Sequence, residues 1–364
     1  MFKIFKDFDW LIAIPIIILA GFSLALLSVS SENFLSSQLL FFVLGLLLFL
    51  IFSQIDFSIY KSLAVFAYLL SIILLSLTFF GPQVRGATRW IEILGTRMQP
   101  SELVKPLMII FFASFFSSYP PRNLKTLSLG LILLLPPLFL IFRQPDLGNA
   151  IIIAGIWLGI VYAGGLPFFL GIGTMIVFFL FLPLGWFLLK SYQKARILSF
   201  LNPYLDPGGA GYNSIQAMIA VGSGQFFGRG LGRGPQSHLL FLPEHHTDFI
   251  FAALSEELGF VGAGLAIIAY IIIFCRILQI VKNIKNPFAS LVLLGIFSQI
   301  SLQVFINIGM NLGLVPITGI TLPLLSYGGS SIISTMIVLG IVVNIGKTIA
   351  RANRAVDISP SSII

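Results

Sequence analysis

Apolar runs of about 20 residues recur along the chain, from its first positions to residue 346. An α-helix needs a run of this length to cross roughly 30 Å of hydrocarbon. The pattern therefore predicts an all-α, polytopic membrane protein with about ten transmembrane helices. The expected spans lie near residues 10–30, 35–54, 59–80, 101–118, 126–142, 148–163, 167–189, 248–275, 288–310 and 325–346.

The segments between these spans predict the orientation of the chain. An even number of spans places both termini on one side of the membrane. Eleven of the 21 Lys and Arg residues fall on that side, and most of the others lie in two long segments, 81–105 and 190–247. Long segments contribute little to the positive-inside rule. We therefore expect cytoplasmic tails at 1–9 and 347–364, and a long extracytoplasmic loop at 190–247 between spans seven and eight, within one integral-membrane domain covering 1–364.

Composition supports this assignment. Hydrophobic residues make up 57% of the chain and charged residues only 9%, against roughly 25% charged residues in soluble domains. The expected orientation places ten Lys and Arg residues on the outer side, against the usual bias, and an anionic ligand at that face would account for them. No basic stripe with interleaved aromatic residues is present, so we expect membrane lipids rather than nucleic acid as partners.

The first polar cluster is "RGATRWIEILGTRMQPSELVKP", residues 85–106. Glu102 and Lys105 share one helix face at i,i+3 spacing, near the start of a span. A charge at membrane depth costs about 3 kcal/mol, so the pair is a functional candidate, with a structural ion pair between helices as the alternative. Trp90 is either part of the same site or an aromatic anchor at the membrane interface.

Two further motifs carry polar residues. In "RQPDLG", residues 143–148, Asp146 stands between two spans, where an aspartate commonly caps a helix or forms a turn. The segment 190–247 contains many glycines but no GxxxxGK[ST] motif, which argues against a nucleotide site. His245 and His246 are adjacent, without a second ligand at i+3 or i+4, so zinc is not expected and no metal ligands are assigned.

Asp248 is the strongest catalytic candidate, in "LPEHHTDFIFAALSEELGF". We expect it in the first turn of span eight, with Ala252, Ser255 and Gly259 following on the same face, so that room is left beside its carboxylate. Glu256 and Glu257 lie roughly 12 Å further along the helix axis. That distance is too large for them to share its proton, and we expect them to tie this helix to its neighbours.

Several motifs together resemble the SEDS family, the shape, elongation, division and sporulation proteins of bacterial cell-wall synthesis. They are "QPSELVK", "RQPDLG", "GYNSIQAMIAVGSG", "LPEHHTDFIFAALSEELGFVG" and "PITGITLPLLSYGGSS", and the resemblance runs from about residue 84 to residue 340. "PITGITLP" and "GSGQFFGRGLGRGPQS" are more similar to the rod-shape, RodA-like branch than to the division branch. Gln225 departs from the paired glycine usual after "GSG" in the family.

The resemblance implies a peptidoglycan glycosyltransferase that polymerises lipid II at the outer face of the cytoplasmic membrane during cell elongation and shape maintenance. An inverting transfer needs a base on the acceptor hydroxyl and stabilisation of the departing diphosphate. Asp248 matches the essential aspartate of the family and is the expected base. Lys105 and Arg196 would offset the diphosphate charge, with Mg²⁺ or Mn²⁺ left open as a cofactor. Further substrate-binding positions are Glu102, which would hold Lys105, and Trp90, Asp146 and His246.

The same resemblance implies a class B penicillin-binding protein, a transpeptidase, as partner. We expect its single transmembrane helix to dock against spans eight and nine, where Gly259, Gly262 and Gly264 would give a small-residue surface. The alternative function is a lipid II flippase, which should present cations at both faces of the membrane. A third possibility, an ion-coupled transporter, would favour acidic residues near the midplane.

Overall fold

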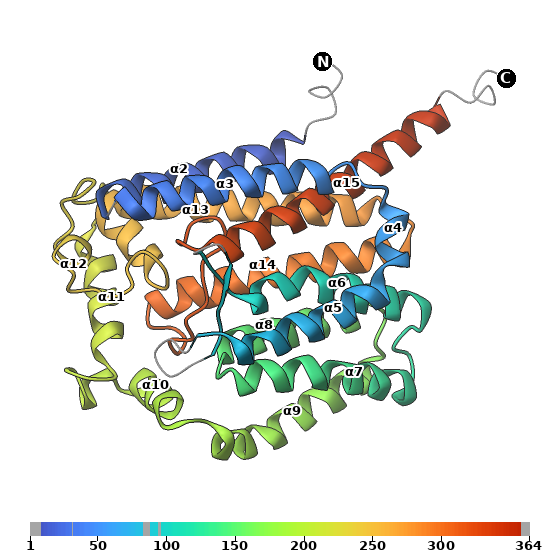
Figure 1. Ribbon diagram of the computed structural model, residues 1–364, viewed down its shortest axis with the longest axis horizontal. Helices are drawn as coiled ribbons and strands as arrows, with labels where there is room; N and C mark the ends of the chain where they lie inside the picture. The colour runs from blue at the N-terminus through green and yellow to red at the C-terminus, as the bar shows by residue number, and fades with distance from the viewer. Residues whose placement is uncertain (1–8, 31, 83–87, 94–95, 358–364) are drawn as a thin grey trace.

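The computed structural model describes residues 9–30, 32–82, 88–93 and 96–357. Its long helices run side by side in one bundle, with α2 beginning and α15 ending at the same end (Figure 1). The helices of the bundle are α2 (Trp10–Ser30), α3 (Glu32–Phe52), α4 (Phe57–Ser62), α5 (Ala64–Leu77), α6 (Pro100–Ser118), α7 (Leu124–Arg143), α8 (Leu147–Ala163), α9 (Phe168–Leu188), α13 (Ile250–Lys282), α14 (Pro287–Asn311) and α15 (Gly329–Asp357).

These helices agree with a polytopic membrane protein. Seven of those in the described part of the chain are long and apolar enough to cross a bilayer, namely α2, α3, α6, α7, α13, α14 and α15. Two shorter apolar helical stretches, Ala64–Phe80 and Leu147–Ala163, correspond to the third and sixth expected spans. The seventh expected span coincides with the 21 residues of α9. The total of about ten spans and their orientation remain predictions.

Several boundaries differ from those expected. The third span is interrupted at Leu63, where α4 ends and α5 begins. The eighth runs on to Lys282, and the last helix continues to Asp357, so the expected tail at 347–364 begins as a helix. Apolar periodicity ends where the membrane ends, whereas a helix continues for as long as its backbone hydrogen bonds are satisfied.

The long segment between α9 and α13 contains short helices. It contains α10 (Ser191–Leu201), the short 3₁₀ helix η2 (Pro203–Leu205), α11 (Tyr212–Ser223) and α12 (Pro235–His238). These elements cover one end of the bundle, on the left in Figure 1. We refer to this end as the loop end. The hairpin of β1 (Ile91–Ile93) and β2 (Thr96–Met98) lies before α6.

Close helix packing in the bundle depends on small residues. α15 packs against α3, and a Cβ added at Gly340 would lie 2.7 Å from the Phe49 carbonyl oxygen. A Cβ at Gly329, the first residue of α15, would meet the Phe41 ring at 2.5 Å. Glycine at these two positions lets the helices approach more closely than any larger residue would allow.

α13 contains a break at Gly259, where φ is 66° and ψ is −162°. The freed backbone groups bond to the segment that follows α11. Phe260 N donates to the Gln225 carbonyl at 2.9 Å, and Val261 N donates to the Phe226 carbonyl at 3.2 Å. A helix break in a membrane protein requires such replacement partners, because unpaired backbone groups are costly in an apolar environment. The break therefore anchors part of the loop end to α13.

Candidate active site

Asp248 lies in the turn that precedes α13, two residues before the helix begins at Ile250. The expectation that it lies in the first helical turn is therefore corrected by two residues. Its side chain is half-buried. Its backbone carbonyl accepts hydrogen bonds from Nδ2 of Asn307 and of Asn311, at 3.0 Å and 3.2 Å. Two amides of α14 thus fix the backbone from which the carboxylate projects.

The sequence analysis missed Asn307 and Asn311. Both are fully buried and lie four residues apart, on one face of α14. Asn307 also donates to the Ile320 carbonyl at 2.7 Å, and Asn311 Oδ1 accepts from Ala252 N at 3.1 Å. Polar side chains are rare inside membrane spans, and those that occur usually form hydrogen bonds with other groups of the protein. Two amides at i,i+4 spacing in an apolar run are the signal that would have found them.

The small residues that follow Asp248 along α13 leave no open channel. Ala252 and Ser255 are buried, and a Cβ at Gly224 would lie only 1.8 Å from the Ser255 carbonyl oxygen. This face therefore packs against the C-terminal end of α11. The expectation of room along Ala252, Ser255 and Gly259 is wrong, because the stripe of small residues serves close packing with the loop end.

Space beside the Asp248 carboxylate lies at Gly319 instead. A Cβ at Gly319 would lie 3.4 Å from Asp248 Oδ2 and 3.9 Å from Arg196 Nη1. Gly319 has a φ of 75°, in the left-handed region that favours glycine. The structure thus brings two of the predicted site residues, Asp248 and Arg196, to one open corner.

Arg196 also lines a small polar pocket at this corner. Its walls come from α10, from the connection between α7 and α8, and from the segment after α14; they include Arg89, Pro145, Tyr192, Arg196 and Thr318. The Arg196 guanidinium lies 5.8 Å from the centre of the Tyr192 ring, and its Nη1 donates to the Ile317 carbonyl at 3.5 Å.

Arg89 is a second cation of this pocket that the sequence analysis counted only among the outer-side charges. Its Nε donates to the Gln144 carbonyl at 3.0 Å, and its Nη2 donates to the Pro145 carbonyl and, at 3.3 Å, to the Tyr192 hydroxyl. Between residues that the structure describes, no ion pair joins Arg89 or Arg196 to a carboxylate. The pocket therefore carries two guanidinium groups that form no salt bridge with another described residue.

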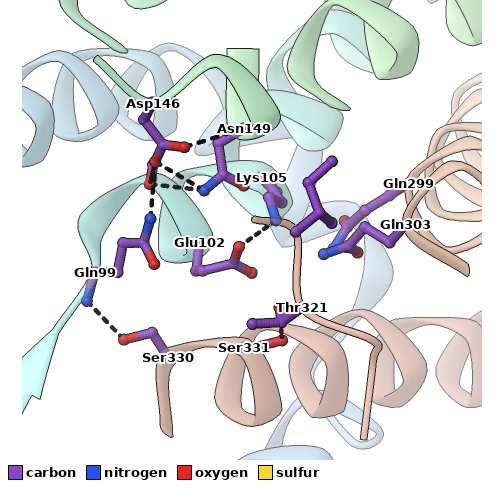
Figure 2. A network of polar contacts seen from close by, with 12 residues as sticks. Gln99, Glu102, Lys105, Asp146, Asn149, Gln299, Gln303, Thr321, Ser330 and Ser331 are labelled. Carbon is purple, nitrogen blue, oxygen red and sulfur yellow. Dashed lines mark hydrogen bonds and ion pairs between the residues drawn. The ribbon is translucent and has the colours of Figure 1, made fainter. Parts of the chain in front are cut away.

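Glu102 and Lys105 form the expected pair on α6. Lys105 Nζ lies 2.6 Å from Glu102 Oε1, and the two residues are 0% and 3% exposed. Figure 2 shows the pair deep inside the bundle, with Gln299 and Gln303 of α14 on the side of Lys105. Glu102 Oε2, Gln299 Oε1 and Gln303 Nε2 are buried without a hydrogen-bond partner. The interior around the ion pair therefore retains unused hydrogen-bonding capacity.

Asp146 caps α8, which was the structural alternative considered for it. Its carboxylate accepts from Gln99 Nε2 at 2.8 Å, from Ser101 Oγ at 2.9 Å, and from Asn149 through Nδ2 at 2.9 Å and N at 3.3 Å (Figure 2). Asp146 therefore joins the starts of α6 and α8. Trp90 lies directly before β1 and is half-buried. Substrate-binding roles for both residues stay predictions.

His246 lies on another side of Asp248. Its ring stacks on Phe34, with 4.5 Å between ring centres, and lies 5.9 Å from the ring of Tyr327. Tyr327 N donates to the His246 carbonyl at 2.8 Å, and Ser326 Oγ donates to the Thr247 carbonyl at 2.7 Å. The turn carrying Asp248 is thus held from both sides. The substrate-binding role of His246 stays a prediction.

One short segment connects these groups. Thr318 lines the polar pocket, Gly319 borders Asp248, and Thr321 Oγ1 donates at 2.9 Å to Ser331 Oγ, within the interior network of Figure 2. The predicted site residues therefore fall into two groups. Asp248 and Arg196 lie at the corner by the pocket, whereas Glu102, Lys105 and Asp146 lie in the interior network, and the segment 318–321 runs between them.

Glu256 and Glu257 have the structural contacts expected for them. Glu256 accepts from the backbone N of Gln236 at 2.8 Å and of Ser237 at 2.9 Å. Glu257 accepts from Gly232 N at 3.2 Å. The two buried carboxylates therefore hold the segment around α12 against α13.

His245 is buried beside this segment. Burial lowers the pKa of its imidazole, while the Leu242 carbonyl and the carboxylates of Glu244 and Glu256 act in the opposite direction. No group of three or more His, Cys, Asp or Glu side chains that could hold a metal ion occurs among the described residues. The Mg²⁺ or Mn²⁺ expectation stays a prediction.

Comparisons with known proteins agree with the motif resemblance. The chain matches the family model described as "Cell cycle protein", that of FtsW, RodA and SpoVE, over residues 4–350. Peptidoglycan glycosyltransferase MrdB of Escherichia coli (strain K12) is 40% identical over 306 residues, which cover 83% of this chain and 82% of that protein. Stage V sporulation protein E of Bacillus subtilis (strain 168) is 36% identical over 328 residues, covering 86% and 87%.

Solved structures share the fold. A chain from the work entitled "Structural coordination of polymerization and crosslinking by a peptidoglycan synthase complex" has a TM-score of 0.82 at 29% identity, covering 94% of this chain and 98% of its own. The crystal structure of Thermus thermophilus rod shape determining protein RodA has a TM-score of 0.70 at 26% identity, covering 93% and 96%. From its motifs, its matched length and its fold, this chain belongs to the FtsW, RodA and SpoVE family of cell cycle proteins.

Proposed function

We infer that this protein is a peptidoglycan glycosyltransferase that polymerises lipid II into glycan strands at the outer face of the bacterial cytoplasmic membrane, during cell elongation and shape maintenance. The Escherichia coli relative MrdB carries the name peptidoglycan glycosyltransferase, and the matched region covers 82% of its length. The observation that carries the chemistry is the Asp248 carboxylate, held at an open corner beside a guanidinium group.

Asp248 is the general base of the proposed transfer. It takes the proton of the acceptor sugar hydroxyl while that oxygen attacks the anomeric carbon of the donor. Positioning of the base matters as much as its presence, since a displacement of about 1 Å can cost on the order of 10²-fold in rate. Asn307 and Asn311 supply that positioning through the Asp248 carbonyl.

Positive charge must stabilise the diphosphate as it departs. Arg196 shares the corner with Asp248 and is the cation best placed for this role. Lys105 is fully buried and paired with Glu102, so it does not contact a substrate in the pocket directly. It acts on the substrate through the side chains of the interior network. We assign Lys105 to positioning the groups around the site.

A transpeptidase partner, of the class B penicillin-binding protein type, fits an unpartnered face of α13. Phe260, Leu265, Ile268 and Ile271 are exposed there, and a Cβ at Gly264 would meet nothing within 4 Å. Gly262 belongs to the interior, since a Cβ there would lie 2.3 Å from Leu258 Cβ. The docking surface expected at Gly259, Gly262 and Gly264 is therefore corrected to the Gly264 face.

Replacement of Asp248 by Asn tests the function. The change keeps shape and removes the charge, so we expect the folded protein to lose glycan polymerisation by at least about 10²-fold. The assay converts labelled lipid II to longer chains with purified protein in detergent, where no second leaflet exists and a flippase would show no turnover. Asp206→Asn, an exposed aspartate on the loop end, is the matched control. Polymerisation at the normal rate by the Asp248→Asn protein would contradict the assignment.

A further inference from the structure

We propose that the pocket of Arg89, Tyr192 and Arg196 binds the diphosphate of the glycosyl donor, and that the polyprenyl chain of the same molecule lies in an apolar groove between α7 and α8. This inference rests on the proposed function, and it assigns the donor, as distinct from the acceptor, to one side of Asp248.

The lining of the pocket has the chemistry of a diphosphate site, and its volume of about 30 Å³ means that its walls must move apart to admit one. Two guanidinium groups and a tyrosine hydroxyl line it, and the described residues place no carboxylate in ion-pair contact with either guanidinium. Arginine binds phosphate oxygens in a bidentate manner, and such charge-assisted hydrogen bonds are about twice as strong as neutral ones. Among the described residues, Arg196 makes one long hydrogen bond, of 3.5 Å to a backbone carbonyl, which leaves further N–H groups to bind a ligand.

The groove has the chemistry of a hydrocarbon site. It has a volume of about 750 Å³ and is shallow and largely open at the surface of the helix bundle. Its lining is apolar and includes Ile132, Leu135, Phe139 and Phe142 of α7, with Ala150 and Ala154 of α8. Ile151 of α8 lines it as well, and Ile132, Leu135 and Phe139 of α7 are exposed there.

The pocket and the groove lie next to one another along α8. Leu147 lines the pocket, and Ala150, one helical turn further along the same face of α8, lines the groove. On the other wall, Phe142 at the end of α7 lies three residues before Pro145 of the pocket. A cationic pocket beside an apolar groove matches a lipid whose diphosphate is attached to a long hydrocarbon chain. This arrangement favours that lipid over a free phosphate.

The geometry also assigns the direction of the transfer. Asp248 Oδ2 and Arg196 Nη1 lie 3.4 Å and 3.9 Å from the same point above Gly319. With the donor diphosphate at Arg196, its anomeric carbon falls between the two groups. A bond then forms from the acceptor oxygen to that carbon as the bond from carbon to phosphate oxygen breaks. The hydroxyl proton passes to Asp248, and the bonding electron pair leaves with the diphosphate at Arg196.

Equilibrium binding of farnesyl diphosphate to the purified full-length protein tests the pocket. We expect farnesyl diphosphate to bind with a dissociation constant at least about tenfold lower than that of inorganic pyrophosphate or of farnesol. Each of these two compounds offers only one half of the ligand. Arg196→Ala should weaken binding by at least about tenfold. Arg89→Lys, which keeps the charge and loses the bidentate geometry, should weaken it as well. Lys194→Ala is the matched control, because Lys194 lies on α10 but contacts Trp186 instead of the pocket.

A second pair of variants tests the groove. Ala154→Trp fills it and should abolish the advantage of farnesyl diphosphate over pyrophosphate while leaving pyrophosphate binding intact. Ala163→Trp, an exposed position at the far end of α8 and outside the groove, should change neither. Equal losses in the two tryptophan variants, or no loss in either, would overturn the assignment of the groove.

Other outcomes separate this inference from the proposed function. Binding needs no chemistry, so Asp248→Asn should bind farnesyl diphosphate normally. A wild-type protein that polymerises lipid II but does not bind farnesyl diphosphate, or whose Arg196→Ala variant binds it normally, overturns the inference alone. Displacement of farnesyl diphosphate by cardiolipin at equal concentration would show a site for phospholipid headgroups, which also overturns it.

Discussion

Gln225 occupies a backbone conformation that suits glycine. Its φ is 49°, in the left-handed region, where a side chain costs roughly 1–2 kcal/mol. Gln225 is also the residue at which the sequence departs from the paired glycine usual after "GSG" in the family. In this conformation the Gln225 carbonyl accepts a hydrogen bond from Phe260 N, across the break in α13, and that bond offsets the cost.

We therefore expect Gln225→Gly to stabilise the protein by about 1 kcal/mol, as a rise in the thermal unfolding midpoint in detergent. The adjacent Gly224→Ala should do the opposite, because its Cβ would lie 1.8 Å from the Ser255 carbonyl oxygen. A lower midpoint for Gln225→Gly would show that the glutamine side chain makes a contribution larger than the strain.

His245 should make stability depend on pH. Burial lowers the pKa of its imidazole in the folded protein, so below about pH 6.5 the unfolded chain binds a proton that the folded chain does not. Stability should then fall as the pH drops from 7 to 5. His245→Gln should flatten that slope while leaving the midpoint near pH 7.5 little changed. Thermal unfolding curves of both proteins between pH 5 and pH 7 measure this dependence. Equal dependence of stability on pH in the two proteins would exclude His245 as the cause.

At the scale of elements, the break in α13 divides its two roles. The residues before Gly259 are buried against the loop end and follow Asp248, whereas those after it include the exposed face at Gly264. The helix that follows the turn carrying Asp248 therefore also presents the surface proposed for a partner. Apolar periodicity alone predicted one continuous span here, because the left-handed residue at the break is a glycine, which fits either conformation.

The α13 face yields a paired test of partner binding. Gly264→Leu should reduce co-purification of a class B penicillin-binding protein and leave polymerisation by the isolated protein unchanged, because its side chain projects into open space. Gly262→Leu should instead lower thermal stability whether or not a partner is present. Unchanged co-purification with Gly264→Leu would place the docking face elsewhere.

At the scale of the whole molecule, the sequence predicted most of the helices but not their junctions. Runs of apolar residues predict spans because hydrocarbon thickness sets their length. The ends of α13 and α15 lie beyond the apolar runs, and the helices of the 190–247 segment lie in a polar, glycine-rich stretch, so apolar runs alone do not mark them.

The site divides in the same way. Asp248 and the Glu102–Lys105 pair were found because charges in an apolar chain are conspicuous. Arg89 was not assigned, because its position beside Tyr192 and Arg196 depends on contacts across about a hundred residues of chain. Asn307 was missed because an amide carries no charge.

The buried ion pair allows a test of the molecule as a whole. Lys105→Ala leaves Glu102 buried without a partner and should destabilise the protein by about 3–5 kcal/mol, with loss of polymerisation. The double change Glu102→Gln with Lys105→Met removes both charges and should recover most of the stability. If polymerisation recovers together with stability, the pair serves only the fold. Polymerisation that stays low in a stable double variant supports its role in positioning the site.

The segment 318–321 has a practical consequence. It lines the polar pocket at Thr318 and is bonded inside the bundle through Thr321 to Ser331. The shape of the pocket to which an antibiotic would bind therefore depends partly on side chains that the drug does not contact. Resistance to such a compound should arise by substitution at Ser331 and Thr321 as readily as at the pocket wall, so screens that sequence only the residues in contact with the drug would overlook it.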